Sequence, residues 1–140
     1  MDIVIYHNPD CGTSRNVVRI VEATGYTPII IEYLKVGWTK GQLLGLFAAA
    51  GLTPRTALRE TKSPAKELGL LEPSVSDEKL LDAMAAEPIL VNRPIVCTRL
   101  GTRLCRPSEV VLDILDRLPA GPFLKEDGQA LIDEKGNRVG

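Results

Sequence analysis

The segment H-N-P-D-C-G-T-S-R near the start of the chain carries the residue types with the clearest chemical potential. Its cysteine, Cys11, stands between a predicted strand and the helix that follows it. A thiol at a helix N-terminus faces unsatisfied backbone N–H groups and the positive end of the helix dipole, which lower its pKa and favour the thiolate. The alternative is a buried structural thiol, but a loop that contains proline and glycine disfavours a packed core position. Cys11 is therefore the predicted nucleophile.

Three neighbours of Cys11 have predicted roles in the same segment. His7, the only histidine, lies four residues upstream and can favour the thiolate as an imidazolium or through a hydrogen bond; the alternative is an ordinary loop residue. Ser14 can offer its hydroxyl to the thiolate or cap the helix. Gly12 has no side chain and lets the backbone approach a ligand closely.

The spacing around Cys11 excludes two common kinds of thiol enzyme. A dithiol oxidoreductase needs Cys-x-x-Cys, but position 14 is serine, and a cysteine phosphatase needs Cys-x5-Arg, but position 17 is valine. Cys11 therefore has no resolving cysteine beside it. If it performs redox chemistry, the second thiol comes from elsewhere.

The other two cysteines, Cys97 and Cys105, lie on β-rich runs that predict a hairpin. With a two-residue turn at 100–101, Cys97 faces Leu104 and Cys105 faces Val96. Because neighbouring residues of a strand point to opposite faces, the two thiols lie on opposite faces and do not bridge each other. Both are interpreted as small buried hydrophobic residues, so an external thiol is the expected partner of Cys11.

The apolar pattern predicts a strand–helix–strand unit, a helical stretch, and then a strand–strand–helix unit. The expected strands are 2–6, 27–33, 95–99 and 102–106, and the expected helices are 14–24, 39–50, 54–59, 77–86 and 107–118. Thr39 and Ser76 are the expected N-caps of the two middle helices. The run 27–33 is rich in β-branched residues and is expected to be a buried strand.

This order of elements is the thioredoxin-like arrangement, a mixed four-stranded sheet with helices on both faces. We therefore expect one α/β domain over residues 1–140, with a helical insertion at 39–87 between the second and third strands. The tail at 119–140 is charged and only weakly patterned. In such a sheet Pro94 faces the nucleophilic cysteine, commonly after a cis peptide bond.

The arginines are concentrated in one stretch of the chain. Residues 88–108 contain four arginines and no acidic residue, so the stretch carries +4 within a chain whose net charge is -1. Arg106 lies where a strand meets the following helix, and Arg93 lies at a strand entrance. A guanidinium fork matches paired oxygens, so these two arginines are candidate ligands for an oxyanion, whereas the other two are interpreted as surface charges.

The composition excludes several classes of partner. A net charge of -1 and an aromatic content of 4% disfavour nucleic acid and anionic membranes. The chain shows no signal peptide and no transmembrane run, and its odd, small number of cysteines argues against a disulfide scaffold. A cytoplasmic location is therefore expected. The sequence does not determine the oligomeric state, although a monomer is favoured.

Three blocks of sequence resemble the glutaredoxin-dependent arsenate reductases. They are Y-H-N-P-D-C-G-T-S-R-N (6–16), N-R-P-I-V (92–96) and G-T-R-L-C-R-P-S-E-V-V-L-D-I-L (101–115). The resemblance implies that Cys11 is the nucleophile and that His7 favours its thiolate. It also implies that Arg59, Arg93 and Arg106 hold the oxyanion; Arg59 is identified by the resemblance alone.

The same resemblance implies a reaction. The Cys11 thiolate attacks arsenate, glutathione attacks the adduct, and arsenite leaves. Glutaredoxin then removes glutathione from Cys11, with no metal, flavin or nicotinamide bound to the chain. Two alternatives remain open from the sequence: a thiol transferase that deglutathionylates proteins, and a non-catalytic transcription regulator of the same fold. Ser14 disfavours the regulator, because regulators of that group usually carry Cys-x-x-Cys near the N-terminus.

Overall fold

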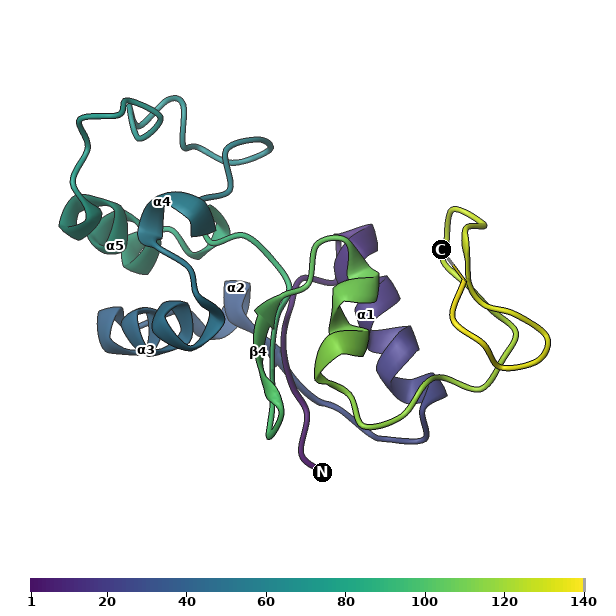
Figure 1. Ribbon diagram of the computed structural model, residues 1–140. Coiled ribbons are helices and arrows are strands. Elements are labelled where there is room, and N and C mark those ends of the chain that lie inside the picture. The colour runs from purple at the N-terminus through teal and green to yellow at the C-terminus, as the bar shows by residue number, and fades with distance from the viewer. Residues whose placement is uncertain (140) are drawn as a thin grey trace. The chain divides into compact units, whose positions relative to one another are not determined.

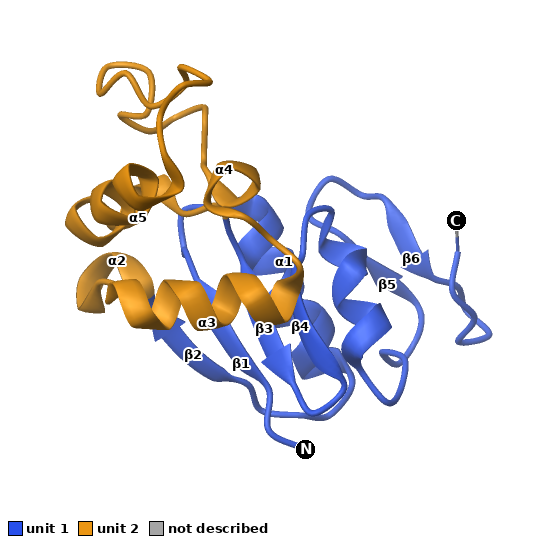
Figure 2. Ribbon diagram, turned by 60° about the vertical axis from the view of Figure 1, so that its left-hand side comes forward, with its two compact units in different colours: residues 1–32, 93–140 blue, residues 33–92 orange. Residues whose placement is uncertain are grey.

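The computed structural model describes residues 1–139 and divides the chain into two compact units (Figure 2). Unit 1 contains residues 1–32 and the chain from residue 93 onward, and unit 2 contains residues 33–92. The predicted helical insertion thus exists and is wider than expected. That the whole chain forms one domain stays a prediction.

The elements of unit 1 form a sheet, two helices and a small hairpin (Figure 1). They are β1 (Val4–His7), α1 (Gly12–Ala23), β2 (Ile29–Glu32), β3 (Ile95–Thr98), β4 (Gly101–Leu104), the 3-10 helix η2 (Ser108–Ile114), β5 (Phe123–Leu124) and β6 (Ala130–Ile132). Unit 2 contains α2 (Tyr33–Val36), α3 (Lys40–Ala50), α4 (Pro54–Ala57), α5 (Asp77–Ala86) and the 3-10 helix η1 (Pro88–Leu90).

The main sheet has the strand order β2-β1-β3-β4 (Figure 2). β1 pairs with β2 in parallel, while β1–β3 and β3–β4 are antiparallel. This confirms the predicted mixed four-stranded sheet. The prediction that the second strand is buried is wrong: Ile29 and Ile30 are 50% and 40% exposed. A β-branched run signals a strand, but it does not distinguish an edge strand from a central one.

Helix α1 and η2 pack on one face of this sheet and form a hydrophobic core with it. In α1, Val17, Ile20 and Val21 fall on one side of the helix and are fully buried. The helix ends where Gly25 adopts a φ of +94°, a left-handed conformation that glycine tolerates best. The buried side of α1 thereby fixes the direction of its N-terminus, where Cys11 stands.

The β3–β4 hairpin forms with a different register from the predicted one. Cys97 is opposite Thr102 rather than Leu104, and the turn residues are 99–100. The Thr98 hydroxyl accepts the Leu100 N–H at 3.0 Å, which closes the turn one residue earlier. Cys105 correspondingly donates its N–H to Pro94 O, instead of facing Val96.

This register is shifted by two residues, so the alternation of faces is preserved and Cys97 and Cys105 still point to opposite faces. Both are free thiols. Cys105 is buried, and burial raises its pKa to about 12. Its interpretation as a small core residue is confirmed. Cys97 is only partly buried.

The predicted long helix 107–118 is wrong in type and length. η2 is a 3-10 helix that starts at Ser108, with Pro107 as its N-cap, and it ends at Ile114. The Thr98 hydroxyl donates to Ile114 O at 2.7 Å, and Leu115 is extended. A carbonyl bonded to the sheet takes no part in a further helical turn, so Leu118 stays outside the helix and is exposed.

The tail contains structure that its weak pattern does not predict. Strands β5 and β6 form an antiparallel hairpin, and Phe123, Leu131 and Ile132 are buried in the core of unit 1. The hairpin is short, and its strands hold too few residues to show a period of two. The tail is therefore an integral part of unit 1.

Unit 2 follows the predicted helical pattern closely. Thr39 and Gln42 form a capping box at the start of α3, and the Ser76 hydroxyl accepts the Lys79 N–H at the start of α5. The predicted helix 54–59 is shorter, because Leu58 is extended and bridges to Val91. No helix in the described part of the chain is long and apolar enough to cross a membrane.

The buried tail predicts a clear stability effect. Ile132→Ala removes a fully buried side chain from the core and should lower the free energy of unfolding by about 2–5 kcal/mol in urea denaturation. The matched control is Leu124→Ala in the partner strand, where the side chain is 51% exposed and the change should stay within about 0.5 kcal/mol. Equal effects of the two substitutions would contradict the docking of the hairpin.

Candidate active site

Cys11 is the N-cap residue of α1 and lies in a loop held by its own hydrogen bonds. Its N–H donates to Asn8 O at 3.1 Å, and the Asp10 N–H donates to Asn8 Oδ1 at 2.9 Å. Asn8 is buried and organises this turn, a role that the sequence analysis missed. Cys11 is 6% exposed and stands at the N-terminus of the helix, where the first backbone N–H groups have no partner within the helix.

The Cys11 thiol is held closer to ionisation than an ordinary cysteine. Burial raises its pKa, because a buried thiolate loses hydration. The Ser14 main-chain N–H, the Arg93 charge and the Arg106 guanidinium oppose this effect and outweigh it. The pKa of Cys11 therefore lies below its ordinary value, as its position at a helix N-terminus predicts.

Arg93 precedes β3 and Arg106 follows β4, so both lie at the open end of the β3–β4 hairpin, and both act on Cys11. Arg106 Nη1 donates to Cys11 Sγ at 3.6 Å and to Arg93 O at 3.2 Å. The Arg93–Pro94 peptide bond is cis. The other two arginines of the basic stretch have different partners: Arg99 pairs with Asp116, and Arg103 donates to Thr102 O. Of the four arginines in the stretch 88–108, Arg93 and Arg106 are the two that lower the pKa of the thiol.

His7 contacts Ser14 through a hydrogen bond of 2.6 Å between Nδ1 and Oγ. Ser14 Oγ also accepts the Asn8 N–H at 3.1 Å. Burial lowers the pKa of His7, Glu32 on the neighbouring strand raises it, and Arg15 lowers it; the net direction is down. The lowered pKa favours the neutral form of the ring, whose Nδ1 and the Ser14 hydroxyl share the hydrogen bond.

This arrangement corrects two details of the predicted site. The imidazolium form of His7 is disfavoured, because burial outweighs the carboxylate beside it. Ser14 is not the helix cap, since Cys11 occupies that position and Ser14 lies inside the first turn. The Ser14 side chain joins His7 to the turn at Asn8, while its main-chain N–H stabilises the thiolate.

Arg59 belongs to unit 2, where the segment after α4 holds it through hydrogen bonds. Its side chain is mostly buried, and its Nε donates to Thr61 O at 3.1 Å. Its main-chain N–H donates to Leu90 O at 2.8 Å, which ties the segment after α4 to η1. The assignment of Arg59 to the oxyanion site continues to rest on the resemblance.

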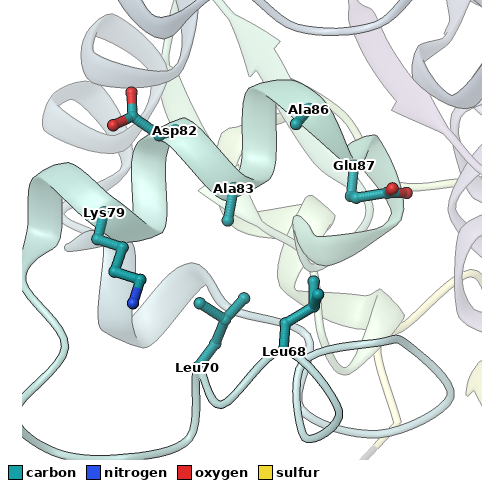
Figure 3. A pocket seen from close by; sticks show the side chains of 7 residues that line it. All are labelled: Leu68, Leu70, Lys79, Asp82, Ala83, Ala86 and Glu87. Carbon is teal, nitrogen blue, oxygen red and sulfur yellow. The ribbon is translucent and has the colours of Figure 1, made fainter.

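A hollow of about 420 Å³ lies within unit 2, between α5 and the preceding loop (Figure 3). Leu68 and Leu70 point into it from the loop, opposite Ala83 on the helix. None of the predicted site residues lines it. Because its walls are mainly apolar and carry no thiol, it does not have the chemistry of the Cys11 site.

Two further residues beside Cys11 have contacts that local patterns do not reveal. Arg15 forms a double hydrogen bond with Glu126, at 2.9 Å for each N–O pair. The two residues are separated by most of the chain, so spacing could not have identified them. Gly12 lies beside this pair: a Cβ placed on it would be 3.6 Å from Arg15 Nη2 and 3.7 Å from Glu126 Oε1.

The fold and this site together define a thioredoxin-like protein with an activated cysteine at a helix N-terminus. The sequence model of the ArsC family matches residues 6–114, and the chain belongs to this family. It is 73% identical over 137 residues to "Arsenate reductase ArsI2" of Synechocystis sp., which covers 98% of each chain. It is 51% identical over 138 residues to "Arsenate reductase" of Escherichia coli (strain K12), covering 99% of this chain and 98% of the relative.

The solved structures agree with this assignment. The structure of "Arsenate reductase from Vibrio cholerae" superimposes with a TM-score of 0.78 at 40% sequence identity, covering 82% of this chain and 98% of that one. The predicted fold class is thereby confirmed.

The geometry around the thiol predicts a measurable ionisation. The rate of Cys11 alkylation by iodoacetamide, followed by mass spectrometry of the Cys11 peptide, should report an apparent pKa below about 8.5. Arg106→Gln removes a donor and a positive charge, so it should raise this pKa, while Arg99→Gln should leave it in place. A wild-type value at or above about 8.5, or equal values for the two variants, would exclude the proposed stabilisation.

Proposed function

We propose that this chain reduces arsenate to arsenite, with Cys11 as the nucleophile. The observation that carries the proposal is the contact of Arg106 with the Cys11 sulfur, beside Arg93, at the N-terminus of α1. A thiolate and two guanidinium groups in one place suit a substrate that is both an oxyanion and an electrophile. Membership of the ArsC family and the full-length similarity to named arsenate reductases support the same substrate.

The first step is the attack of the Cys11 sulfur on arsenic. An arsenate anion would repel a thiolate in the absence of positive charge, so the arginines lower the barrier by compensating both charges. A bond forms between sulfur and arsenic, and one arsenate oxygen leaves as water after taking up protons. The Ser14 N–H and the turn at Asn8 hold the sulfur in place for this attack.

The second step needs a thiol that the Cys11 segment does not contain. We propose glutathione as this co-substrate: its sulfur attacks the Cys11 sulfur, the sulfur–arsenic bond breaks, and its electron pair stays on arsenic. Cys11 and glutathione become a mixed disulfide, and As(V) becomes As(III). In balance, one arsenate and two thiols give one arsenite, one disulfide and one water. The two electrons come from the thiols, so the chain needs no bound cofactor.

Glutaredoxin is the proposed partner that restores the Cys11 thiol by accepting glutathione from it. Cys105 is a poor internal substitute, because it is buried and its pKa is raised to about 12. The dependence on reduced glutathione fits a cytoplasmic location, where thiols are kept reduced. We further propose that Arg59 takes part in oxyanion binding, as the resemblance implies, and that His7 and Ser14 support the geometry of the Cys11 loop.

The activity is tested by arsenate-dependent oxidation of NADPH in the presence of glutathione, glutaredoxin and glutathione reductase. The wild-type chain should show this rate, and Cys11→Ser should abolish it because the nucleophile is gone. Cys97→Ser should keep most of it, since Cys97 lies outside the site. A glutathione-linked thiol transferase would instead show activity on glutathionylated substrates and none that depends on arsenate.

The arginines should affect arsenate turnover unequally across the basic stretch. Arg106→Ala removes a donor to the reacting centre and should lower kcat/KM for arsenate by about 10²–10³-fold. Arg59→Ala should also lower it, because the resemblance implies that Arg59 helps to hold the oxyanion. The control is Arg99→Ala, which removes the same charge from the same hairpin and should change kcat/KM by less than about twofold after screening. Equal losses for Arg106→Ala and Arg99→Ala would show that only net charge matters.

A further inference from the structure

We propose that Glu126, in the turn between β5 and β6, is a positioning residue for the Cys11 nucleophile and acts through Arg15. The inference rests on the proposed function, because it treats Cys11 as the reacting group. It gives a role to the C-terminal tail, which follows the part of the chain that matches the ArsC family model.

The Arg15 guanidinium connects the tail to the loop that carries Cys11. Its Nε and Nη2 donate to the two carboxylate oxygens of Glu126, each at 2.9 Å. Its remaining nitrogen, Nη1, donates to Pro9 O at 2.9 Å. Since the guanidinium is planar and rigid, the direction of the carboxylate fixes the position of the Pro9 carbonyl, two residues before Cys11.

The turn that presents Glu126 is itself held along α1. The Glu126 N–H donates to Asn16 Oδ1 at 3.0 Å, and Arg19 Nη2 donates to Leu124 O at 3.2 Å. Within the turn, the Lys125 N–H donates to Gln129 O at 2.9 Å. The carboxylate therefore reaches Arg15 from a fixed backbone instead of a loose end.

Lys125, the residue before Glu126, forms an ion pair of its own, in which the tail supplies the positive charge. Lys125 Nζ pairs with Glu109 Oε2 at 3.0 Å, and the Lys125 side chain is only 9% exposed. Glu109 lies in the first turn of η2, just after Arg106. Two consecutive tail residues of opposite charge thus hold both segments that bring reactive groups together, the Cys11 helix and the Arg106 connection.

The value of the Arg15–Glu126 pair lies in position and charge more than in stability. Its side chains are 44% and 37% exposed, and ion pairs at such exposure contribute little to folding. The hairpin is anchored independently by buried Phe123 and Ile132. Loss of the pair should therefore leave the fold intact while releasing the Pro9 carbonyl.

The pair also balances the charge beside the thiol. Both charged ends lie next to Gly12, the residue that follows Cys11. The other charged groups that act on the thiol are Arg93 and Arg106 from the β3–β4 hairpin, while His7 on β1 and Asp10 in the loop interact with Arg15. Arg15 interacts electrostatically with Cys11, and its pairing with Glu126 offsets part of its charge; removal of one partner leaves the other unopposed near the thiolate.

Three variants test this inference: Glu126→Gln, Arg15→Gln and the double variant. Glu126→Gln leaves Arg15 unopposed and should lower the pKa of Cys11 measured by alkylation. Arg15→Gln leaves the carboxylate unopposed and should raise that pKa, and the double variant should return it to near the wild-type value. All three should lower kcat/KM for arsenate by about 3–30-fold, because each frees the loop. Higher salt should shrink the pKa differences but leave the loss of kcat/KM.

The control is Glu134→Gln, which removes an exposed glutamate from the same tail and should change neither quantity. Glu126→Asp keeps the charge and should keep the pKa of Cys11 near the wild-type value while it lowers kcat/KM. Unchanged kcat/KM in all three variants, or pKa shifts of the same sign in both single variants, would overturn the inference. The alkylation series does not depend on arsenate, so it remains a test even if the wild-type chain fails to reduce arsenate.

Discussion

The structure of unit 1 depends on keeping a sulfur anion in a position that is almost closed to water. Burial opposes the charge on Cys11, and the opposing groups come from three separate parts of the chain: the first turn of α1, the entrance of β3 and the end of β4. Together these contributions outweigh the effect of burial. The sheet is what holds them together, because β3 lies between β1 and β4 and so brings both hairpin arginines to the strand that leads into Cys11.

Local sequence determines the parts of this arrangement that local physics controls. The sequence predicted Cys11 at the N-terminus of the following helix, and it lies there as the N-cap residue, although the helix begins at Gly12 and not at residue 14. The helix caps at Thr39 and Ser76 were equally predictable, because a capping hydroxyl and the amide that it binds lie three residues apart. The mixed character of the sheet followed from the βαβ and ββα units, since strands joined through a helix can pair in parallel and strands joined by a tight turn pair antiparallel.

The features that sequence patterns could not predict arise from contacts between distant segments. The register of the β3–β4 hairpin differs from the predicted one because the Thr98 side chain closes the turn. The helix η2 is shorter than predicted because it ends where the same hydroxyl donates to Ile114 O. The neutral form of His7 depends on burial that no spacing shows. Glu126 lies far along the chain from Arg15, in a tail too short to display a period. Arg59 was found only through the family, because its segment has no local chemical signal.

Unit 1 is built from two stretches of chain that are separated by the whole of unit 2. Cys11 is therefore synthesised well before Arg93 and Arg106, the two arginines that stabilise its thiolate. The insertion eases the joining of the two stretches, because α2 at its start packs against η1 at its end. In folded unit 2, the two ends of the insertion are close together. The β1–β3 pair can then form with a smaller loss of chain entropy than the closing of a flexible loop of the same length would cost. Cys11 therefore gains its two arginine partners only when the second stretch of unit 1 pairs with the first.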